Sequence, residues 1–185
     1  MTVVVSMLRG VNLAGRNKIK MDVLRALCES LGLQDAQTYV QSGNVVFRAK
    51  ERPTATLARR MEDAIERKAG FRPAVILRTP AELRAVIAAN PFAGRGGIEP
   101  GKLLVTFLAA SPNAAARAEI GAIKTDPEEM HVGGRELYIY FPNGVGRSKL
   151  SLAKVERAVK LAGTARNWNT VNRLLEMGEA METER

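Results

Sequence analysis

The sequence predicts an α+β protein with two ferredoxin-like subdomains of the βαββαβ type, and three patterns support this prediction. Strand and helix patterns follow one another in the order βαββαβ over residues 1–90. The same order starts again with an apolar strand predicted at 103–109. Between them, the Gly/Pro-rich stretch 91–101 is typical of a linker. We therefore expect subdomains at 1–90 and 102–185, joined by residues 91–101.

The first half contains the clearest strand and helix patterns. The run from Val3 to Leu8 is apolar at nearly every position, which predicts a central strand covered on both faces. A polar loop, a helix ended by Gly32 and a hairpin turning at residues 42–44 follow. For this hairpin we expect a two-residue loop. A second helix at 54–68 and a strand at 73–78 complete the first subdomain, and a capping box beginning at Thr79 starts a further helix.

The second half repeats this order with one element fewer. A hairpin is predicted across Gly133-Gly134, which places His131 directly opposite Glu136 as a cross-strand polar pair. Residues 164–170 are predicted to be a loop leading into the last helix, in which Trp168 is a core anchor. The second subdomain is therefore expected to lack its fourth strand and to end in C-terminal helices.

Composition and charge restrict the class of protein. The 185 residues are 46% hydrophobic and 25% charged, as in an ordinary globular protein. The formal net charge is +9, and residues 1–90 hold 15 Lys/Arg against 8 Asp/Glu. A positive field attracts phosphates and nucleic acid, although a solvated basic surface needed only for solubility is the alternative.

Other classes lack the residues they need. The chain has one cysteine and one histidine. A single cysteine excludes an internal disulfide, and the two residues together are too few for a zinc site and make a cysteine–histidine dyad a poor expectation. Cys28 lies on the apolar stripe of a helix and is expected to be a buried thiol. We therefore expect no metal and no cofactor. We also expect no membrane association, because the N-terminal apolar run is too short for a signal peptide or a transmembrane span. A cytoplasmic monomer or homodimer is expected.

Three polar loops, each preceding a helix, are candidate binding sites. Glycines let a ligand approach the backbone, and the amide groups and dipole of a helix start favour an anion. The loops span residues 9–18, 144–149 and 166–170, but their glycines match neither GxGxxG nor the phosphate-loop spacing. A structural turn is the alternative for each. With the 42–44 turn, they supply the candidate ligand-binding residues Arg9, Asn12, Asn17, Lys18, Gly43, Asn44, Lys149, Arg166, Asn167 and Asn169.

Three functional hypotheses fit these features. The first is a protein that binds a phosphate-bearing anion, such as a small molecule, a nucleotide or nucleic acid, with Tyr39, Tyr138 and Tyr140 on predicted open sheet faces. The alternative is an enzyme acting on a small phosphorylated or carboxylated substrate, in which Arg9, Lys149 and Arg166 stabilise negative charge. No acid or base for such an enzyme is fixed by spacing. A third hypothesis is an interaction module that uses sheet edges.

Several of these stretches also carry a resemblance to a known family. They are Met7-Leu8-Arg9-Gly10-Val11-Asn12, the run from Thr38 to Phe47 with Gln41-Ser42-Gly43-Asn44, Arg147-Ser148-Lys149-Leu150, and Thr164 to Thr170 with Arg166-Asn167-Trp168-Asn169. Together they resemble the mostly bacterial domain-of-unknown-function family 1697, from about Met1 to Met177. The resemblance implies an α+β fold with two ferredoxin-like subdomains. It implies no activity, cofactor or catalytic residue.

Overall fold

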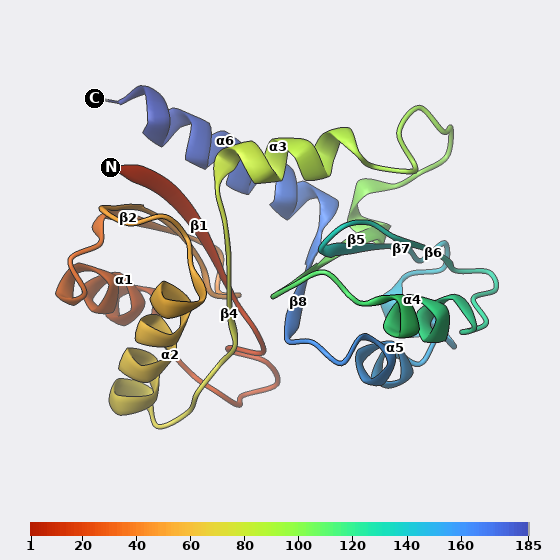
Figure 1. Cartoon of the computed structure of the whole chain (residues 1–185), viewed down its shortest axis with the longest axis horizontal. Helices are drawn as coiled ribbons and strands as arrows, with labels where there is room; N and C mark the ends of the chain where they lie inside the picture. The colour runs from red at the N-terminus through yellow and green to blue at the C-terminus, as the bar shows by residue number, and fades with distance from the viewer. Residues whose placement is uncertain (185) are drawn as a thin grey trace. The chain divides into compact units, whose positions relative to one another are not determined.

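The computed structural model describes residues 1–184, which form two compact units. The first unit comprises residues 1–85 together with the chain from Asn172 onward, and the second comprises Val86–Val171. Each contains a four-stranded antiparallel sheet with helices, so the predicted α+β class is confirmed (Figure 1). Residues 91–101 lie within the second unit. The division into domains joined by a linker at 91–101 stays a prediction.

The sheet of the first unit has the strand order β2-β3-β1-β4. The central strand β1 pairs antiparallel with β3 and with β4, so that Val5 lies between Val46 and Arg78. This is the predicted position of the apolar N-terminal strand. The elements of this unit up to its fourth strand are β1 (Thr2–Leu8), α1 (Met21–Ser30), β2 (Gln34–Tyr39), β3 (Asn44–Ala49), α2 (Ala55–Ala69) and β4 (Val75–Arg78).

Helices α1 and α2 cover one face of this sheet (Figure 1). Their apolar stripes contribute Leu24, Leu57 and Met61 to a core that also contains Val4 and Phe47 of the sheet. Each large apolar side chain buried in this way stabilises the fold by roughly 1.5–3 kcal/mol relative to exposure. The Thr54 hydroxyl caps α2 by accepting from the Leu57 amide. The helix ends at Gly70, whose φ of +77° is a left-handed conformation that glycine adopts without strain.

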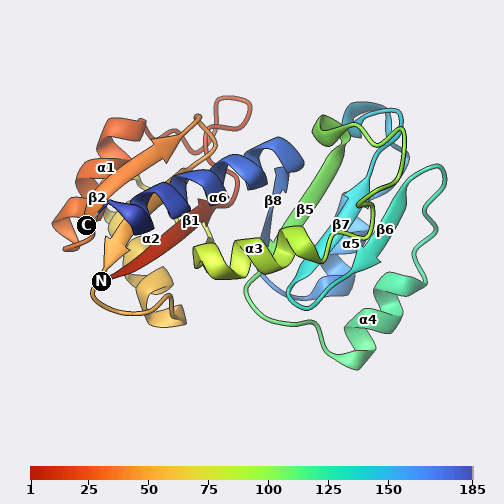
Figure 2. The same ribbon diagram turned by 90° about the horizontal axis from the view of Figure 1, so that it is seen from above.

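The opposite face of the first sheet is covered by part of α6 (Trp168–Thr183) and the start of α3 (Pro80–Ala88) (Figure 2). The predicted capping box starts α3, because the Glu82 amide donates to the Thr79 hydroxyl and the Thr79 amide donates to the Glu82 carboxylate. A Cβ added at Gly178 of α6 would lie 2.9 Å from Cγ of Pro80 and 3.7 Å from Cγ2 of Val5. The first sheet is therefore buried on both faces, as the apolar pattern of β1 indicates.

The sheet of the second unit has the order β6-β7-β5-β8, and its fourth strand corrects the prediction of an incomplete subdomain. Strand β8 pairs along its length with β5, from Leu104 opposite Asn167 to Leu108 opposite Gly163. Its sequence, GTARN, carries no alternation of apolar residues that would predict a strand. The elements are β5 (Leu103–Leu108), α4 (Ala114–Gly121), β6 (Glu129–Val132), β7 (Glu136–Tyr140), α5 (Leu152–Val159) and β8 (Gly163–Asn167), with 3-10 turns at Pro100–Lys102 and Val145–Arg147.

Both hairpins have a register that differs from the prediction. Tyr39 pairs with Asn44 in the first and Val132 pairs with Leu137 in the second. In the second hairpin this register places His131 opposite Tyr138, so the predicted pair with Glu136 is wrong. The ring of His131 instead packs edge-on against Phe92, with centroids 5.2 Å apart.

The tyrosines of the second sheet are buried, which corrects the prediction that they lie on an open face. Tyr138 is 2% exposed and donates its hydroxyl to the Val86 carbonyl at 2.8 Å, while Tyr140 is 7% exposed and donates to the Gly97 carbonyl at 3.1 Å. The segment 86–102 therefore covers this face of the sheet. Neither tyrosine is placed to stack on a base, and of the three predicted residues only Tyr39 is partly exposed.

Candidate functional site

Two asparagines hold the loop between β1 and α1 in one conformation. The Asn12 side chain accepts from the Ile19 amide at 2.9 Å and donates to the carbonyls of Ile19 and Gln41 at 2.9 and 2.8 Å. The Asn17 side chain donates to the Gly10 carbonyl at 3.0 Å. Both have positive φ, 54° and 49°, which asparagine tolerates better than most residues. The loop is thus fixed before any ligand arrives.

The turn between β2 and β3 packs directly against this loop. The Gly43 carbonyl accepts from the Leu8 amide at 3.0 Å, and Gly43 has a φ of +77°. A Cβ at this position would lie 2.6 Å from Cγ2 of Val11 and 2.8 Å from Cβ of Leu8, so only glycine fits. The buried Asn44 side chain donates to the Tyr39 carbonyl and the Ser42 hydroxyl. The structure therefore brings together the predicted residues Asn12, Gly43 and Asn44.

A depression of about 690 Å³ lies beside this loop and turn in the first unit. Three exposed lysines contribute to its lining: Lys18 from the loop, Lys20 before α1, and Lys68 from the last turn of α2. None of the three forms an ion pair with another residue of the chain from 1 to 184. The remaining lining residues are Asn12, Gly15, Ile19, Val23, Gln41 and Ala69.

The N-terminus of α1 lies at the edge of the same depression and has no side-chain cap. Lys20 occupies the cap position and accepts no hydrogen bond with its side chain. The Val23 amide donates to the carboxylate of Asp22. Among the described residues, the amides of Met21 and Asp22 have no acceptor. These two donors, and the partial positive charge of the helix start, favour an anion at this position.

Most carboxylates of the first unit are already paired elsewhere. Arg72 contacts Glu62, Asp63 and Glu66, and its hydrogen bond holds the pKa of Asp63 below the usual value. Glu51 pairs with Arg60, and Asp35 pairs with Arg48. Because these acids are matched with arginines, the positive charge at the lysine-lined depression is not neutralised by them.

The candidate residues of the second unit have different environments. Arg166 of β8 is 7% exposed and donates to the Thr164 hydroxyl at 2.7 Å and the Ala165 carbonyl at 2.8 Å. Burial lowers the pKa of Arg166 to about 10, so the side chain remains charged at neutral pH. The Asn167 side chain accepts from the Thr170 amide and caps α6. Trp168, which was predicted to anchor the last helix in the core, is partly exposed.

The other predicted residues of the loops are less constrained. Lys149 and Asn169 are exposed, and no hydrogen bond or ion pair joins Lys149 to residues 166–169. Arg9 is partly buried, and its amide donates to the Ala74 carbonyl at 2.9 Å. Direct contact between a ligand and any of the ten candidate residues stays a prediction.

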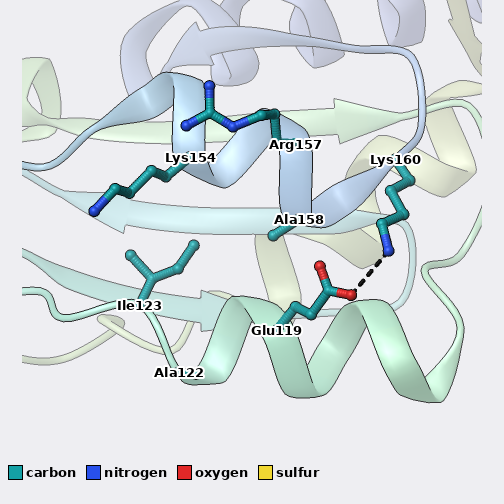
Figure 3. Close-up of a pocket in the computed structure, with 7 residues that line it drawn as sticks. All are labelled: Glu119, Ala122, Ile123, Lys154, Arg157, Ala158 and Lys160. Atoms are coloured by element: carbon teal, nitrogen blue, oxygen red, sulfur yellow. Dashed lines mark hydrogen bonds and ion pairs between the residues drawn. The ribbon is translucent and has the colours of Figure 1, made fainter.

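A second hollow lies between α4 and α5 of the second unit (Figure 3). Its volume is about 640 Å³, and Lys154, Arg157 and Lys160 of the α5 segment line it. The Lys160 ammonium pairs with the Glu119 carboxylate of α4 at 2.8 Å. No local sequence pattern indicates this hollow, because two helix faces form it and it contains no glycine-rich loop.

Two lysines of the first depression were also missed by sequence reasoning. Lys20 follows the predicted loop directly and occupies the N-cap position of α1, where Ser, Thr, Asp or Asn is usual. A cation at this position is the sequence feature that could have indicated the site. Lys68 lies 50 residues after Lys18, and only the packing of α2 beside α1 brings it to the depression. That packing carries no local sequence signal.

Groups that perform acid–base, thiol or metal chemistry are sparse in residues 1–184. Burial raises the pKa of the Cys28 thiol to about 12, with a smaller contribution from Glu29, so the thiol is not a nucleophile at neutral pH. Within the same residues, no group of three or more His, Cys, Asp or Glu side chains could hold a metal ion. None of the described helices combines the length and apolar character needed to cross a bilayer.

Comparison with known proteins places the chain in a family. The model of the family described as "Protein of unknown function (DUF1697)" matches residues 1–138. The chain belongs to this family. The match includes the Leu8–Asn12 and Gln41–Asn44 stretches that carry the resemblance, whereas the Arg147–Leu150 and Thr164–Thr170 stretches lie beyond it.

Among solved structures, a conserved bacterial protein from Streptococcus pneumoniae has a similar fold. The two chains share 21% sequence identity with a TM-score of 0.72, and the alignment covers 97% of this chain and 99% of that chain. At this identity the similarity shows the fold alone. No curated protein matches the chain.

Proposed function

We propose that this protein binds a phosphate-bearing anion, in the cytoplasm, at the lysine-lined depression of the first unit. The observation that carries the proposal is the start of α1, where the Met21 and Asp22 amides have no acceptor among the described residues. Lys18 and Lys20 flank this helix start, although its dipole disfavours cations there. An anion would satisfy the amides and compensate the lysines at once.

A phosphate group fits this arrangement better than an isolated carboxylate. Three lysines line the depression, and a phosphate offers more negative charge and more acceptor oxygens than a carboxylate. The volume of about 690 Å³ also falls within the range of small-molecule sites, which would accommodate a nucleotide. A single strand of nucleic acid would present its phosphates to the same lysines.

In this proposal the predicted residues have two roles. Lys18 contacts the anion, and so do Lys20 and Lys68, which were not predicted. Asn12, Asn17, Gly43 and Asn44 fix the loop and turn that position Lys18, because their polar groups bond to the backbone or to neighbouring side chains. A loop that is already ordered reduces the entropy cost of binding.

The test removes the lysine charges together and measures binding of defined probes. A fluorescent adenine nucleotide and a labelled mixed-sequence oligonucleotide are titrated separately, with binding followed by fluorescence anisotropy. We expect the triple variant Lys18→Gln, Lys20→Gln and Lys68→Gln to weaken binding by about tenfold or more, since charge-assisted contacts are lost.

The matched control removes the same charge elsewhere. Lys50→Gln, Arg52→Gln and Lys124→Gln change exposed cations that do not line the depression. This variant should bind nearly as well as the parent protein. An equal loss in the two triple variants would show that overall charge, and not the depression, holds the anion.

The salt dependence distinguishes the two kinds of ligand. Binding through several phosphates makes log K fall steeply with log salt, whereas a nucleotide with one contact region gives a shallow dependence. An oligonucleotide affinity that does not change between about 50 and 200 mM salt would exclude nucleic acid as the ligand.

A further inference from the structure

The hollow between α4 and α5 has an apolar floor and a basic rim. We call its apolar lining residues, Ala122, Ile123 and Ala158, the floor, and its charged ones, Lys154, Arg157, Lys160 and Glu119, the rim. No aromatic side chain is among the lining residues. We call this hollow the α4/α5 groove.

The charges of the groove are only partly explained by helix stability. Arg157 and Lys160 lie at the C-terminal end of α5, where cations compensate the helix dipole. Lys154 lies in the first turn of the same helix, where the dipole disfavours a cation. Neither Lys154 nor Arg157 forms an ion pair with another residue from 1 to 184. An interaction outside the chain would account for them.

The arrangement of the side chains favours an extended partner over a small anion. Figure 3 shows the cations spread along the hollow, with the Lys154 ammonium far from the Lys160 ammonium. The Lys160–Glu119 pair lies toward one end of the groove, and Lys154 and Ile123 lie toward the other. A ligand that uses the whole groove therefore has an apolar side and acidic groups spaced along it.

We propose that the α4/α5 groove binds an acidic amphipathic helix of a partner protein. Apolar side chains of that helix contact Ile123 and Ala158, and its carboxylates pair with Lys154 and Arg157. This is the helix-in-groove mode of recognition, with charge complementarity at the rim. An apolar floor without aromatic residues suits aliphatic side chains and offers no stacking surface for bases.

The carboxylate of Glu119 is expected to weaken binding of an acidic partner. Its pair with Lys160 joins two exposed side chains, so it contributes little to stability. The carboxylate of Glu119 competes with an acidic partner for Lys160. Removing its charge should strengthen binding of the partner.

The test uses a synthetic probe and methyl NMR of the full chain. The probe is a helical peptide of about 14 residues, with leucines at helical spacing flanked by glutamates, and its control carries lysines in place of the glutamates. We expect the acidic peptide to shift the methyl resonances of Ile123, Ala122 and Ala158. The control peptide should leave them unchanged.

Variants then identify the residues responsible. Lys154→Glu with Arg157→Glu should weaken binding of the acidic peptide about tenfold, as expected when two surface pairs are lost and replaced by repulsion. Glu119→Gln should strengthen it severalfold. Lys50→Glu with Arg52→Glu, a matched charge reversal in the first unit, should leave the affinity nearly unchanged. Unchanged melting temperatures confirm that each variant is folded.

Three results would overturn the proposal. The first is the absence of methyl shifts at millimolar acidic peptide, and the second is equal binding of the basic peptide. The third is an oligonucleotide that shifts the groove methyls while the acidic peptide does not, which would assign the groove to nucleic acid. Because Lys18, Lys20 and Lys68 do not line the groove, their variants separate this test from that of anion binding.

Discussion

Gly43 illustrates how a single residue joins the first loop to the sheet. Replacing it with alanine adds a Cβ that overlaps Val11 and Leu8 and forces a left-handed conformation on a residue that disfavours it. We expect Gly43→Ala to lower the free energy of unfolding by about 2–4 kcal/mol, as the sum of overpacking and backbone strain. Urea unfolding followed by circular dichroism measures this change.

Gly15 provides the matched control for Gly43. It has a similar φ of +78°, but an added Cβ would meet only Cε of Lys18, at 3.9 Å. Gly15→Ala should therefore cost only the backbone strain, about 1–2 kcal/mol. Equal losses in the two variants would show that the contact between the turn and the loop contributes nothing.

Cys28 makes the stability of the fold depend on alkaline pH. Burial raises the pKa of its thiol from 9.0 to about 12, so the unfolded chain loses this proton at lower pH than the folded chain. The raised thiol pKa contributes fully to the free energy of unfolding below pH 9. This contribution is lost as the pH rises from 9 toward 12, at about 1.4 kcal/mol per pH unit.

Comparison with Cys28→Ala isolates this effect. Between pH 8 and pH 10, urea unfolding should show that the parent protein loses about 1.4 kcal/mol more of its unfolding free energy than the variant does. Other titrating groups contribute equally to both proteins. The same pH dependence in both would contradict the assignment of a raised thiol pKa.

At the residue scale, the sequence identified polar loop residues but not their partners. Asn12 and Gly43 stand out as an asparagine and a glycine in polar turns, which predicts a turn or an anion contact equally well. The hydrogen bond from Asn12 to Gln41 spans 29 residues, so it depends on tertiary packing. No local pattern distinguishes an amide that binds a ligand from one that fixes a loop.

At the scale of elements, α6 closes the second face of the first sheet through a close approach at Gly178. Gly178→Leu would place a large side chain against Pro80 and Val5, and we expect a loss of about 2 kcal/mol or more in unfolding free energy. The control Ala180→Leu introduces the same side chain at an exposed position of the same helix and should change stability by no more than about 0.5 kcal/mol. Similar losses in both would show that α6 does not pack through Gly178.

The elements differ in how far their own sequence predicts them. Strand β1 was predictable because an apolar run of this length is stable only between two covered faces. Strand β8 was not, because its polar sequence is stabilised by backbone pairing with β5, which lies about 60 residues earlier. The hairpin registers were missed because each depends on which residues form the turn. The faces were predicted correctly in the second hairpin, because a register shift of two residues returns each side chain to the same face.

At the scale of the whole molecule, the sequence predicts the net charge directly but does not predict where the unpaired cations lie. The net charge of +9 follows directly from composition. Which cations remain unpaired does not, because Arg72, Arg60 and Arg48 are matched with carboxylates and Lys18, Lys20 and Lys68 are not. Unpaired cations therefore lie at several places among the described residues, and the depression beside α1 is one of them.

The most direct test of anion binding observes the two amides at the start of α1. In ¹⁵N-edited NMR spectra, titration with pyrophosphate should shift the Met21 and Asp22 amide resonances together in a saturable way. The shifts should be lost in the variant with Lys18→Gln, Lys20→Gln and Lys68→Gln. Saturable shifts confined to amides elsewhere in the chain, or no shifts at millimolar pyrophosphate, would contradict the account.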